Sequence, residues 1–419
     1  MTTNATRVAL DVPQVQRRVV RTLSASQTFG GIAVAGSVPA GALIAASLGG
    51  DQFAGLAQTF GVLGAAVFAL PLARIALNKG RRAALSVGYG LGCIGAVVVV
   101  VAGAIRVAPL VLLGTLLVGV ASAAGYQARY AATDLAVESH RARALSIVVW
   151  AGTVGAVLGP NLLNVSGNMA LSFGLPQLTG PYLLAAVMLA LAVVVLFLLL
   201  RPDPYLLARK IAAKASASGE LAPRPRLRDG IEHLRQHRRA MLGVTSVALG
   251  HVVMVSVMVM TPVHMAHVDV SLQLIGLVIS VHVLGMYAFS PLVGWLVDRL
   301  GRLQMVLVGV GILLVSCVVC GLAAPDSVPV LAAGLFLLGL GWSCTLIAGS
   351  TLVTDDVIEN ERPAVQGLSD LVMNLAAAIG GAIAGVIVAT SSYSVLCAVT
   401  AVPVLTLGAL VVRERVAAH

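Results

Sequence analysis

The chain has 419 residues, of which 58% are hydrophobic and 11% are charged, and its formal net charge is +10. A soluble chain carries roughly 25% charged residues, so this composition, with a mean hydropathy of +0.97, excludes an ordinary soluble domain. Apolar runs of about 20 residues or more recur along the chain, and each is long enough to cross about 30 Å of hydrocarbon. The composition therefore predicts a protein that crosses a membrane many times.

The apolar runs are continuous and rich in glycine and alanine, without the alternation of apolar and polar residues that a membrane barrel shows. They predict transmembrane helices with small residues at their contacts. We expect an all-α membrane protein with twelve transmembrane helices. The approximate cores of these helices are residues 23–49, 53–77, 83–105, 108–132, 143–166, 180–200, 241–266, 272–297, 304–324, 328–352, 364–390 and 392–412.

The lysines and arginines are distributed asymmetrically around these runs. If the chain starts in the cytoplasm, all 27 Lys and Arg residues except Arg106 fall in cytoplasmic segments. The positive-inside rule then places both termini in the cytoplasm of a protein that crosses the cytoplasmic membrane many times. The basic charge is explained by topology, so no nucleic-acid partner is expected. The start of the chain does not resemble a cleaved secretory signal.

The longest polar stretch, residues 201–240, divides the chain into two parts of six helices each. We expect a cytoplasmic N-terminal segment (1–22), an N-terminal six-helix bundle (23–200), a basic cytoplasmic linker (201–240), a C-terminal six-helix bundle (241–413) and a cytoplasmic tail (414–419). The linker is predicted to be a connector with one surface helix. A regulatory or lipid-contacting role is the alternative.

The two parts repeat one another at an offset of 221 residues. The segment "LGAAVFALPLARIALNKGRR" at Leu63 aligns with "LGMYAFSPLVGWLVDRLGRL" at Leu284, and a second block at Thr133 aligns with one at Thr354. Two separate blocks with one offset indicate an internal duplication. Each part has an even number of spans, so both insert in the same orientation. Parallel six-helix repeats with a site at their interface are a transporter architecture.

Two motifs carry a family resemblance. "GWLVDRLGR", from Gly294 to Arg302, resembles the helix 2–3 signature of the major facilitator superfamily, and its first-half counterpart has Ala73 and Leu77 in place of the glycine and the aspartate. "GTVGAVLGP" resembles the helix 5 motif of the drug:proton antiporters in that superfamily. The residues of this second motif are Gly152, Gly155, Gly159 and Pro160. The resemblance implies a monomeric twelve-helix transporter of the antiporter branch that works by alternating access, although Thr115 stands where those antiporters carry an arginine.

The signature at Gly294 predicts a conformational latch. Asp298 ends the second-half helix just before the turn at Gly301, and the repeat places that turn near the start of helix 5. A carboxylate is stabilised at a helix N-terminus by free N–H groups and a partial positive charge. We therefore expect Asp298, Arg299, Gly301 and Arg302 to hold the two halves together, and a salt bridge within the loop is the alternative. Because Leu77 replaces the equivalent aspartate, the latch should be one-sided.

Ionisable groups inside the membrane are candidates for proton coupling, because a charge in hydrocarbon is costly and usually functional. Asp370 lies about 10 Å inside helix 11, and its repeat mate is Val149. Burial disfavours its ionised form, whereas an approach by Arg129 would favour it. Asn374, one turn on, could hydrogen-bond the carboxyl or a ligand. Asp370 and Asp134 are the predicted proton-coupling residues; a fixed pair with Arg129 is the alternative role for Asp370.

Further polar and aromatic residues in the apolar runs are candidates for the substrate cavity. The resemblance places helices 1, 4, 7 and 10 around that cavity, and an apolar cavity with a few polar groups suits amphipathic small molecules. The histidines are equally compatible with hydrogen-bonded packing, and the lack of clustered ligands makes metal transport less favoured. The predicted cavity residues are Tyr126, Arg129, His251, Met254, His282, Trp342 and Asn374.

The sequence supports three functional hypotheses to different degrees. The first is a secondary active transporter that exports a small amphipathic organic compound in exchange for protons. The second is a proton-coupled importer or exporter of an anionic metabolite, with Arg129 as the anion site. The third, a membrane sensor or enzyme, is disfavoured because the sequence has no soluble catalytic domain and no phosphate-binding loop. We expect no enzymatic activity and no cofactor, with a small molecule, protons and the lipid bilayer as the partners.

Overall fold

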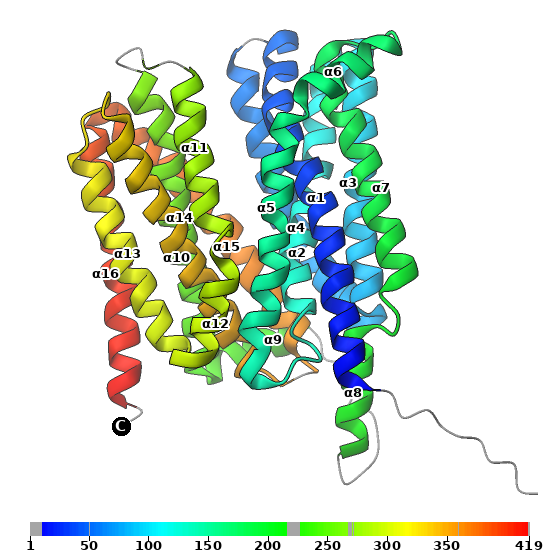
Figure 1. Ribbon diagram of the computed structural model, residues 1–419, viewed down its shortest axis with the longest axis vertical. Coiled ribbons are helices and arrows are strands. Elements are labelled where there is room, and N and C mark those ends of the chain that lie inside the picture. Colours follow the sequence, from blue (N-terminus) through cyan, green and yellow to red (C-terminus); the bar gives the residue numbers. More distant parts are fainter. Residues whose placement is uncertain are drawn as a thin grey trace, which may run out of the picture.

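The computed structural model describes residues 11–49, 51–215, 227–266, 270, 272–358 and 360–417, so the expected N-terminal segment, linker and tail lie partly outside it. The described residues form helices and no strands (Figure 1). The first half contains α1 (Val12–Gly49), α2 (Asp51–Lys79), α3 (Arg81–Ile105), α4 (Ala108–Ala131), α5 (Arg141–Asn161), α6 (Leu163–Ser172) and α7 (Gly180–Leu199). The connector holds α8 (Pro204–Ala215) and α9 (Leu227–Gln236). The second half contains α10 (Arg238–Ala266), α11 (Leu272–Tyr287), α12 (Ser290–Leu300), α13 (Arg302–Leu322), α14 (Val328–Asp355), α15 (Arg362–Thr390) and α16 (Tyr393–Ala417).

The predicted all-α membrane fold is confirmed. Within the described residues, 11 helical segments are long and apolar enough to cross a membrane. The remaining long helix, α1, has 38 residues, well beyond the roughly 20 needed for a crossing. It lies against α5 and α7 along the same bundle, so the chain makes the twelve crossings expected from the sequence. Many large apolar side chains stay exposed on the outer helices, as a lipid-facing surface requires.

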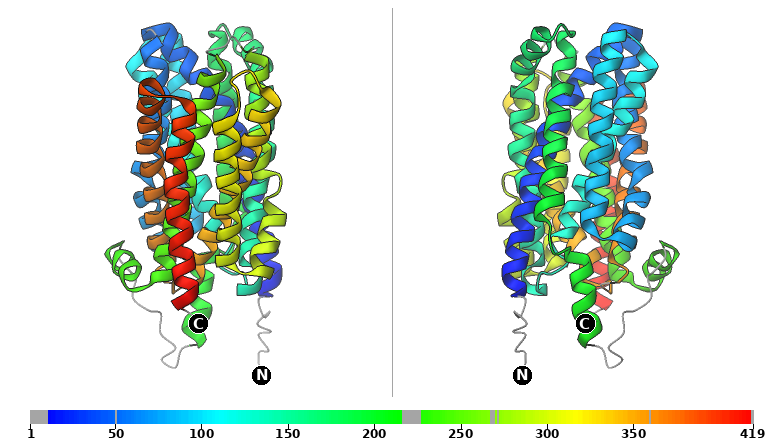
Figure 2. Two further views of the ribbon diagram at one scale, coloured as in Figure 1. Left: turned by 90° about the vertical axis from the view of Figure 1, so that its left-hand side faces the viewer. Right: turned by 90° about the vertical axis from the view of Figure 1, so that its right-hand side faces the viewer.

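The two halves stand side by side, and the connector lies at one end of the bundle. We call this the linker end and the opposite one the far end. Helix α1 begins and α16 finishes at the linker end (Figures 1 and 2). Figure 1 shows the halves closest together at the linker end and diverging toward the far end. The connector carries two helices in its described part, where the sequence predicted one.

One predicted span is broken. The run at residues 272–297 forms α11 and α12, which are separated by a turn between Tyr287 and Ser290. Pro291 stands in the first turn of α12. Because proline has no N–H group and its ring collides with the preceding turn, a continuous helix through this position is disfavoured. After the break, α12, which carries the signature motif, packs against α5 of the first half.

The helix 5 motif forms a close contact between α5 and α1. A Cβ atom on Gly155 would lie 2.6 Å from the backbone of Gly31, and one on Gly159 would lie 2.7 Å from the backbone nitrogen of Gly36. Gly152 borders the same crossing through its carbonyl oxygen. Small residues of this kind let helix backbones approach within the membrane. The side chain of Pro160, the last residue of the motif, is outside the described set.

The halves meet at two crossings that the internal repeat relates to each other. At the α5–α12 crossing, Gly294 faces Ser146; at the α2–α15 crossing, Ala73 faces Gly367. The 221-residue offset relates Gly294 to Ala73 and Ser146 to Gly367. At the first crossing the glycine belongs to α12, whereas at the second it belongs to α15, which corresponds to α5 in the repeat. The alanine that interrupts the first-half signature is accommodated because the facing helix supplies the glycine.

Candidate functional site

A buried ion pair joins the two halves inside the membrane. Nη2 of Arg129 on α4 lies 2.7 Å from Oδ1 of Asp370 on α15, and the two side chains are 3% and 1% exposed. Among the described residues, Nε of Arg129 and Oδ2 of Asp370 have no hydrogen-bond partner. The predicted approach of Arg129 to Asp370 is therefore present in this conformation. A buried pair of this kind leaves a costly unpaired charge if its partners separate.

Aromatic rings surround the guanidinium of Arg129. Its Cζ atom lies 4.8 Å from the ring centre of Tyr130 and 5.6 Å from that of Tyr126. Such cation–π contacts stabilise a buried cation by about 0.5–2 kcal/mol. The hydroxyl of Tyr130 also donates to Oγ of Ser369 (3.4 Å), one residue from Asp370. The sequence reasoning missed both residues of this second bridge between the halves, although their intramembrane polar groups could have indicated it.

A cavity opens beside this pair. It has two lobes that share Val34, Ser122 and Tyr126, one lobe bordered by α1, α2, α4, α7 and α15, the other by α1, α3, α4, α5 and α11. No charged side chain lines either lobe within the described part of the chain. We call this the central cavity. Its larger polar and aromatic lining residues are Gln27, Gln58, Tyr89, Tyr126, Tyr182, Tyr287 and Asn374.

The lining differs in part from the predicted one. Of the predicted cavity residues, Tyr126 and Asn374 reach the central cavity, and Arg129 contacts it through the ring of Tyr126. The amide of Asn374 donates to the backbone oxygen of Asp370 (2.7 Å). In this conformation it therefore does not bind the carboxyl group, which was the role suggested by their spacing. Four of the seven tyrosines line the cavity, a concentration visible only once the helices are assembled.

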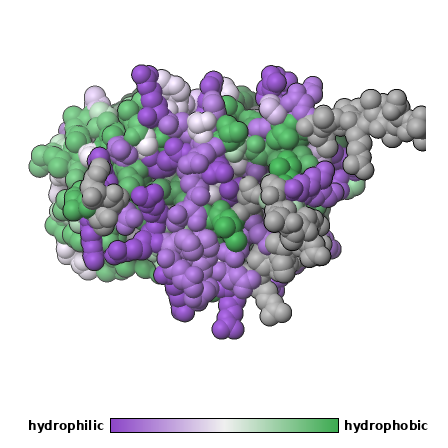
Figure 3. Space-filling view, turned by 90° about the horizontal axis from the view of Figure 1, so that it is seen from below, coloured by the Kyte–Doolittle hydropathy of each residue, from purple (hydrophilic) through white to green (hydrophobic). Residues whose placement is uncertain are grey.

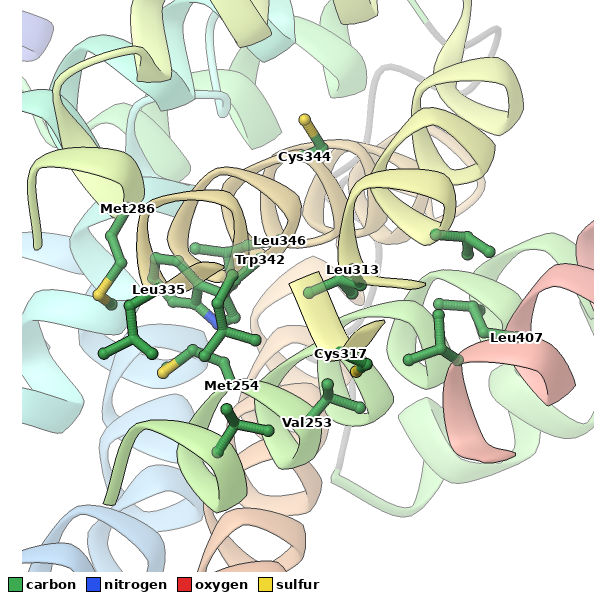
Figure 4. Close-up of a cluster of buried hydrophobic side chains, with 14 of the residues drawn as sticks. Val253, Met254, Met286, Leu313, Cys317, Leu335, Trp342, Cys344, Leu346 and Leu407 are labelled. Carbon is green, nitrogen blue, oxygen red and sulfur yellow. The ribbon is translucent and has the colours of Figure 1, made fainter. Parts of the chain in front are cut away.

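His251, Trp342 and Met254 lie one layer behind the central cavity. Nε1 of Trp342 donates to Nδ1 of His251 (2.9 Å), and Tyr287, which does line the cavity, packs edge-on against Trp342. Met254 belongs to the same buried cluster as Trp342, as Figure 4 shows. Because Nδ1 of His251 accepts, neutral His251 carries its proton on Nε2. These residues support the position of Tyr287.

His282 lies away from the central cavity. Its side chain is 0% exposed, and Nδ1 donates to the backbone oxygen of Leu335 (2.8 Å), which joins α11 to α14. The backbones of α11 and α14 also approach each other closely here: a Cβ atom on Gly339 of α14 would lie 2.5 Å from the carbonyl oxygen of His282. Of the two roles considered for this histidine, the geometry favours hydrogen-bonded packing.

Asp134 lies at the linker end, in an ion pair. Its two carboxylate oxygens accept from Nε and Nη2 of Arg81 at 2.8 and 3.1 Å, and both side chains are 1% exposed. Nη2 of Arg81 also donates to Oε1 of Gln366 on α15, which extends the network into the second half. Asp134 is thus separate from the central cavity and from the Arg129–Asp370 pair, and its role in proton coupling stays a prediction. In this conformation its carboxylate fixes Arg81.

The repeat places a related network on the other side of the linker end. Asp355, the mate of Asp134, pairs with Arg302, the mate of Arg81, at 2.8 Å. Asp355 also pairs with Arg141 of the first half at 2.6 Å. Arg302 donates in addition to the backbone oxygen of Glu138 (2.8 Å). Both networks cross between the halves, one through a neutral glutamine and the other through a salt bridge.

Asp298 occupies the position predicted for the latch. Its two carboxylate oxygens accept from the backbone N–H groups of Ala142 and Arg143, at 3.2 and 3.0 Å, at the start of α5. Gly301 forms the turn after α12 with a φ of +101°, a conformation that strongly favours glycine. Arg299 differs from the expectation. It is exposed and stacks on Trp295 of its own helix, with its Cζ 5.0 Å from the ring centre.

At the opposite crossing, no carboxylate takes the place of Asp298. Leu77, the mate of Asp298, packs in a buried cluster with Ala364 of α15 and Tyr205 of α8. The residue corresponding to Ala142 is Pro363, which has no N–H group to offer. A carboxylate at position 77 would therefore lack one of the two donors that Asp298 uses. The apolar side chain of Leu77 needs neither donor.

The connector completes this second closure. The hydroxyl of Tyr205 donates to the backbone oxygen of Asn360 in the second half (2.7 Å). Asp203 accepts from the backbone N–H of Arg82 at 2.8 Å and so caps α3 of the first half. The start of α8 is thus bonded to both halves. From the sequence this segment was expected to be a connector with one surface helix, and the tyrosine in a polar stretch was the missed signal of a bonded contact.

Comparisons with known proteins agree with this architecture. The sequence model of the Major Facilitator Superfamily matches residues 23–269 and 254–418. An uncharacterized MFS-type transporter of Bacillus subtilis strain 168, YdeG, is 42% identical over 400 residues, which cover 95% of this chain and 92% of that protein. The riboflavin transporter RfnT of Brucella anthropi is 28% identical over 382 residues, 91% of each protein. A crystal structure of a bacterial homologue of the iron transporter ferroportin, in an outward-facing state, superimposes with a TM-score of 0.73 at 14% identity and covers 95% of this chain and 98% of that one.

Proposed function

The chain belongs to the major facilitator superfamily, and we propose that this transporter is a proton-coupled carrier that exports a small amphipathic organic compound. Members of the family are membrane transporters and not enzymes. Parallel six-helix repeats around a central site suit transport by alternating access, in which one half rocks against the other.

The observation that carries the proposal is the Arg129–Asp370 pair. It bridges α4 and α15 in the membrane interior at 2.7 Å, so a rocking motion between the halves changes the distance between its charges. Next to Arg129, the carboxylate is favoured in its ionised form. When the halves move and Arg129 is no longer close, the buried carboxylate favours its protonated form. A group that binds a proton in one conformation and releases it in another provides coupling.

The substrate class follows from the central cavity. Its lining is aromatic and polar but uncharged, and the nearest charges, Arg129 and Asp370, neutralise each other. Such a cavity suits an uncharged amphipathic molecule with a flat ring system and hydrogen-bonding groups. The similarity to a riboflavin transporter makes riboflavin a suitable first probe.

The positive-inside rule assigns the linker end to the cytoplasm. With that orientation, the latches at Asp298 and Leu77 close the cytoplasmic side, and the described conformation is outward-facing. Protonation of Asp370 from outside would then release Arg129 and permit the transition that opens the cytoplasmic side. Proton entry and substrate exit thus use opposite directions of the same conformational change.

A second candidate is transport of an anionic metabolite. Nε of Arg129 has no partner in the described part of the chain, and protonation of Asp370 would leave the guanidinium free for an anion. In that case transport would require a negatively charged substrate. The uncharged lining of the cavity favours the first candidate.

The coupling role is tested with everted membrane vesicles that carry an imposed pH gradient. Purified protein is first screened for ligands by thermal shift, with riboflavin as the first probe, and the bound compound is then used for transport. We expect wild-type vesicles to accumulate the compound, and Asp370→Asn to abolish this accumulation while exchange at equal pH continues. Asp326→Asn, which removes an exposed carboxylate at the far end, serves as the control. Proton-driven accumulation by the Asp370→Asn variant would show that Asp370 is not the proton carrier.

A further inference from the structure

Two pockets on the outer sides of the linker end gather arginines beside apolar residues. The first, the α1–α7 pocket, contains Arg17, Arg18 and Arg21 together with Val15, Ala25 and Leu199. The second, the α10–α16 pocket, contains Arg235, Arg238 and Arg413 together with Met241, Leu242 and Leu410. Neither pocket belongs to the central cavity. Figure 3, which looks onto this end, shows hydrophilic residues gathered over it and hydrophobic residues toward its edge.

The internal repeat relates the two pockets. Each lies between the first and the sixth membrane helix of its half, α1 with α7 and α10 with α16. The 221-residue offset pairs Arg17 with Arg238 and Arg18 with Arg239. The two halves have diverged at most positions, including the signature motif. An arginine pair that recurs at the same register, next to a pocket in both halves, therefore points to a shared task.

The arginines of both pockets carry charge that the described protein does not neutralise. None of the six forms an ion pair with an acidic side chain in the described ranges, and Arg17 only donates to the backbone oxygen of Pro13 at 3.5 Å. Glu414 lines the second pocket but pairs with Arg239 at 3.7 Å. Asp11 lines the first pocket and caps the N–H of Gln14 at 3.2 Å. Each pocket is therefore a site of excess positive charge.

Apolar residues of both pockets lie further into the bundle than the arginines on the same helices: Ala25 in the first pocket, and Met241, Leu242 and Leu410 in the second. Leu199 is 45% exposed, Met241 is 41% exposed and Leu410 is 40% exposed. Guanidinium groups bind phosphate oxygens through paired N–H donors, and exposed leucine and methionine side chains suit an acyl chain. A free phosphate ion would use only the first of these features. An anionic phospholipid uses both.

We propose that the α1–α7 and α10–α16 pockets each bind an anionic phospholipid from the leaflet at the linker end. Basic pockets between transmembrane helices at a membrane surface are a recurrent form of such sites. The six arginines bind the phosphate groups, and the exposed apolar residues contact the upper part of the acyl chains.

The second site also holds the connector. Arg235 and its neighbour Leu234 belong to α9, and the next residue back, His233, bonds the second half through both ring nitrogens, to the backbone oxygen of Asp356 and to Glu361, each at 2.9 Å. A lipid in this pocket therefore contacts α9 on one face while α15 and the preceding loop bind the other.

The test measures lipid binding by the purified full-length protein. Native mass spectrometry and thermal shift are recorded with phosphatidylglycerol or cardiolipin, with phosphatidylcholine, and with inorganic phosphate alone. We compare wild type with R17Q/R18Q/R21Q, with R235Q/R238Q/R413Q and with the six-fold combination. Each arginine near the surface contributes about a five-fold gain in affinity for anionic lipid, so each triple variant should weaken its site by about 100-fold. The control K79Q/K210Q/K214Q removes the same charge from exposed positions of the same end.

We expect wild type to bind the anionic lipids in preference to phosphatidylcholine. Each triple variant should bind half as many anionic lipid molecules as wild type, and the six-fold variant should lose the preference. The control variant should bind as wild type does. Equal losses in the control would show a diffuse effect of charge and overturn the proposal. Equal stabilisation by inorganic phosphate would identify a site for a free anion and would also overturn it. Unchanged stability of every variant in phosphatidylcholine verifies folding.

Discussion

Replacing Asp298 with asparagine should shift the transporter toward conformations that are open at the linker end. The carboxylate accepts two backbone N–H bonds, at 3.2 and 3.0 Å, from the start of α5. Asparagine keeps one acceptor oxygen but loses one hydrogen bond, worth about 0.5–1.5 kcal/mol, and the charge at the helix N-terminus, worth about 0.3–2 kcal/mol. The closed state should lose about 2 kcal/mol, which changes its ratio to the open state roughly 30-fold.

Two cysteine reporters in a chain without native cysteines would measure this shift. Ala142→Cys lies at the α5–α12 contact, where the alanine is 0% exposed, so its reaction with a soluble thiol reagent should accelerate when the linker end opens. Gln58→Cys lies at an exposed position of the central cavity toward the far end, so its reaction should slow when that end closes. The opposite responses distinguish a conformational shift from general loosening, which would accelerate both reactions.

Arg299→Gln provides the matched control. It alters the next residue of the same motif, but Arg299 is exposed and stacks on Trp295 without a bond to α5. Its labelling pattern should equal that of the parent chain. If Asp298→Asn also left both reporters unchanged, the two N–H bonds would contribute nothing to closure, and the latch interpretation would be wrong.

Two further changes test the parts of the fold that the carboxylate does not reach. Tyr205→Ala should expose an Ala364→Cys reporter, because it removes the apolar contact between the connector and both halves. Tyr205→Phe should expose it less, because only the hydrogen bond to Asn360 is lost. Equal labelling of the reporter in these two variants and in the parent chain would contradict a closing role for α8. Gly155→Ala should lower the midpoint of thermal unfolding, because its Cβ would lie 2.6 Å from the backbone of α1 and overpacking of this kind costs about 1–3 kcal/mol. Gly90→Ala is the control, because a Cβ there meets nothing within 4 Å, and it should leave the midpoint unchanged. Equal midpoints for the two variants would show that the α1–α5 crossing adapts to the added methyl group.

The fold was predictable from the sequence because its main determinants are long-range averages. Apolar runs of about 20 residues set the number of crossings, and two blocks with a common 221-residue offset set the duplication. The contact of Asp298 with the start of helix 5 followed from the same symmetry. The break before Pro291 was missed, because an apolar run long enough to cross the membrane concealed the effect of a single proline on the helix.

The partners of individual side chains were less predictable. Asp134 and Asp370 are both intramembrane or near-membrane carboxylates, yet one pairs with Arg81 at the linker end and the other with Arg129 beside the cavity. Their depth in the bundle, their facing helix and the direction of each side chain decide this difference. The role of Tyr287 was hidden for the same reason, because it reaches the cavity from a different half than most of the lining.

The repeat-related crossings at the linker end show how one architecture supports two kinds of closure. On the α5–α12 side, Asp298 and Asp355 supply charge to Arg141 and to the backbone of α5. On the α2–α15 side, Leu77 and Tyr205 supply apolar contact and one neutral hydrogen bond, and Arg81, paired with Asp134, donates to the neutral Gln366. Opening the first side separates opposite charges that pair across the halves, whereas opening the second exposes apolar surface and breaks the bond from Arg81 to the neutral Gln366. The leucine at position 77 thus faces Pro363, which has no N–H group to offer a carboxylate, and the connector takes part in closing this second side through Tyr205.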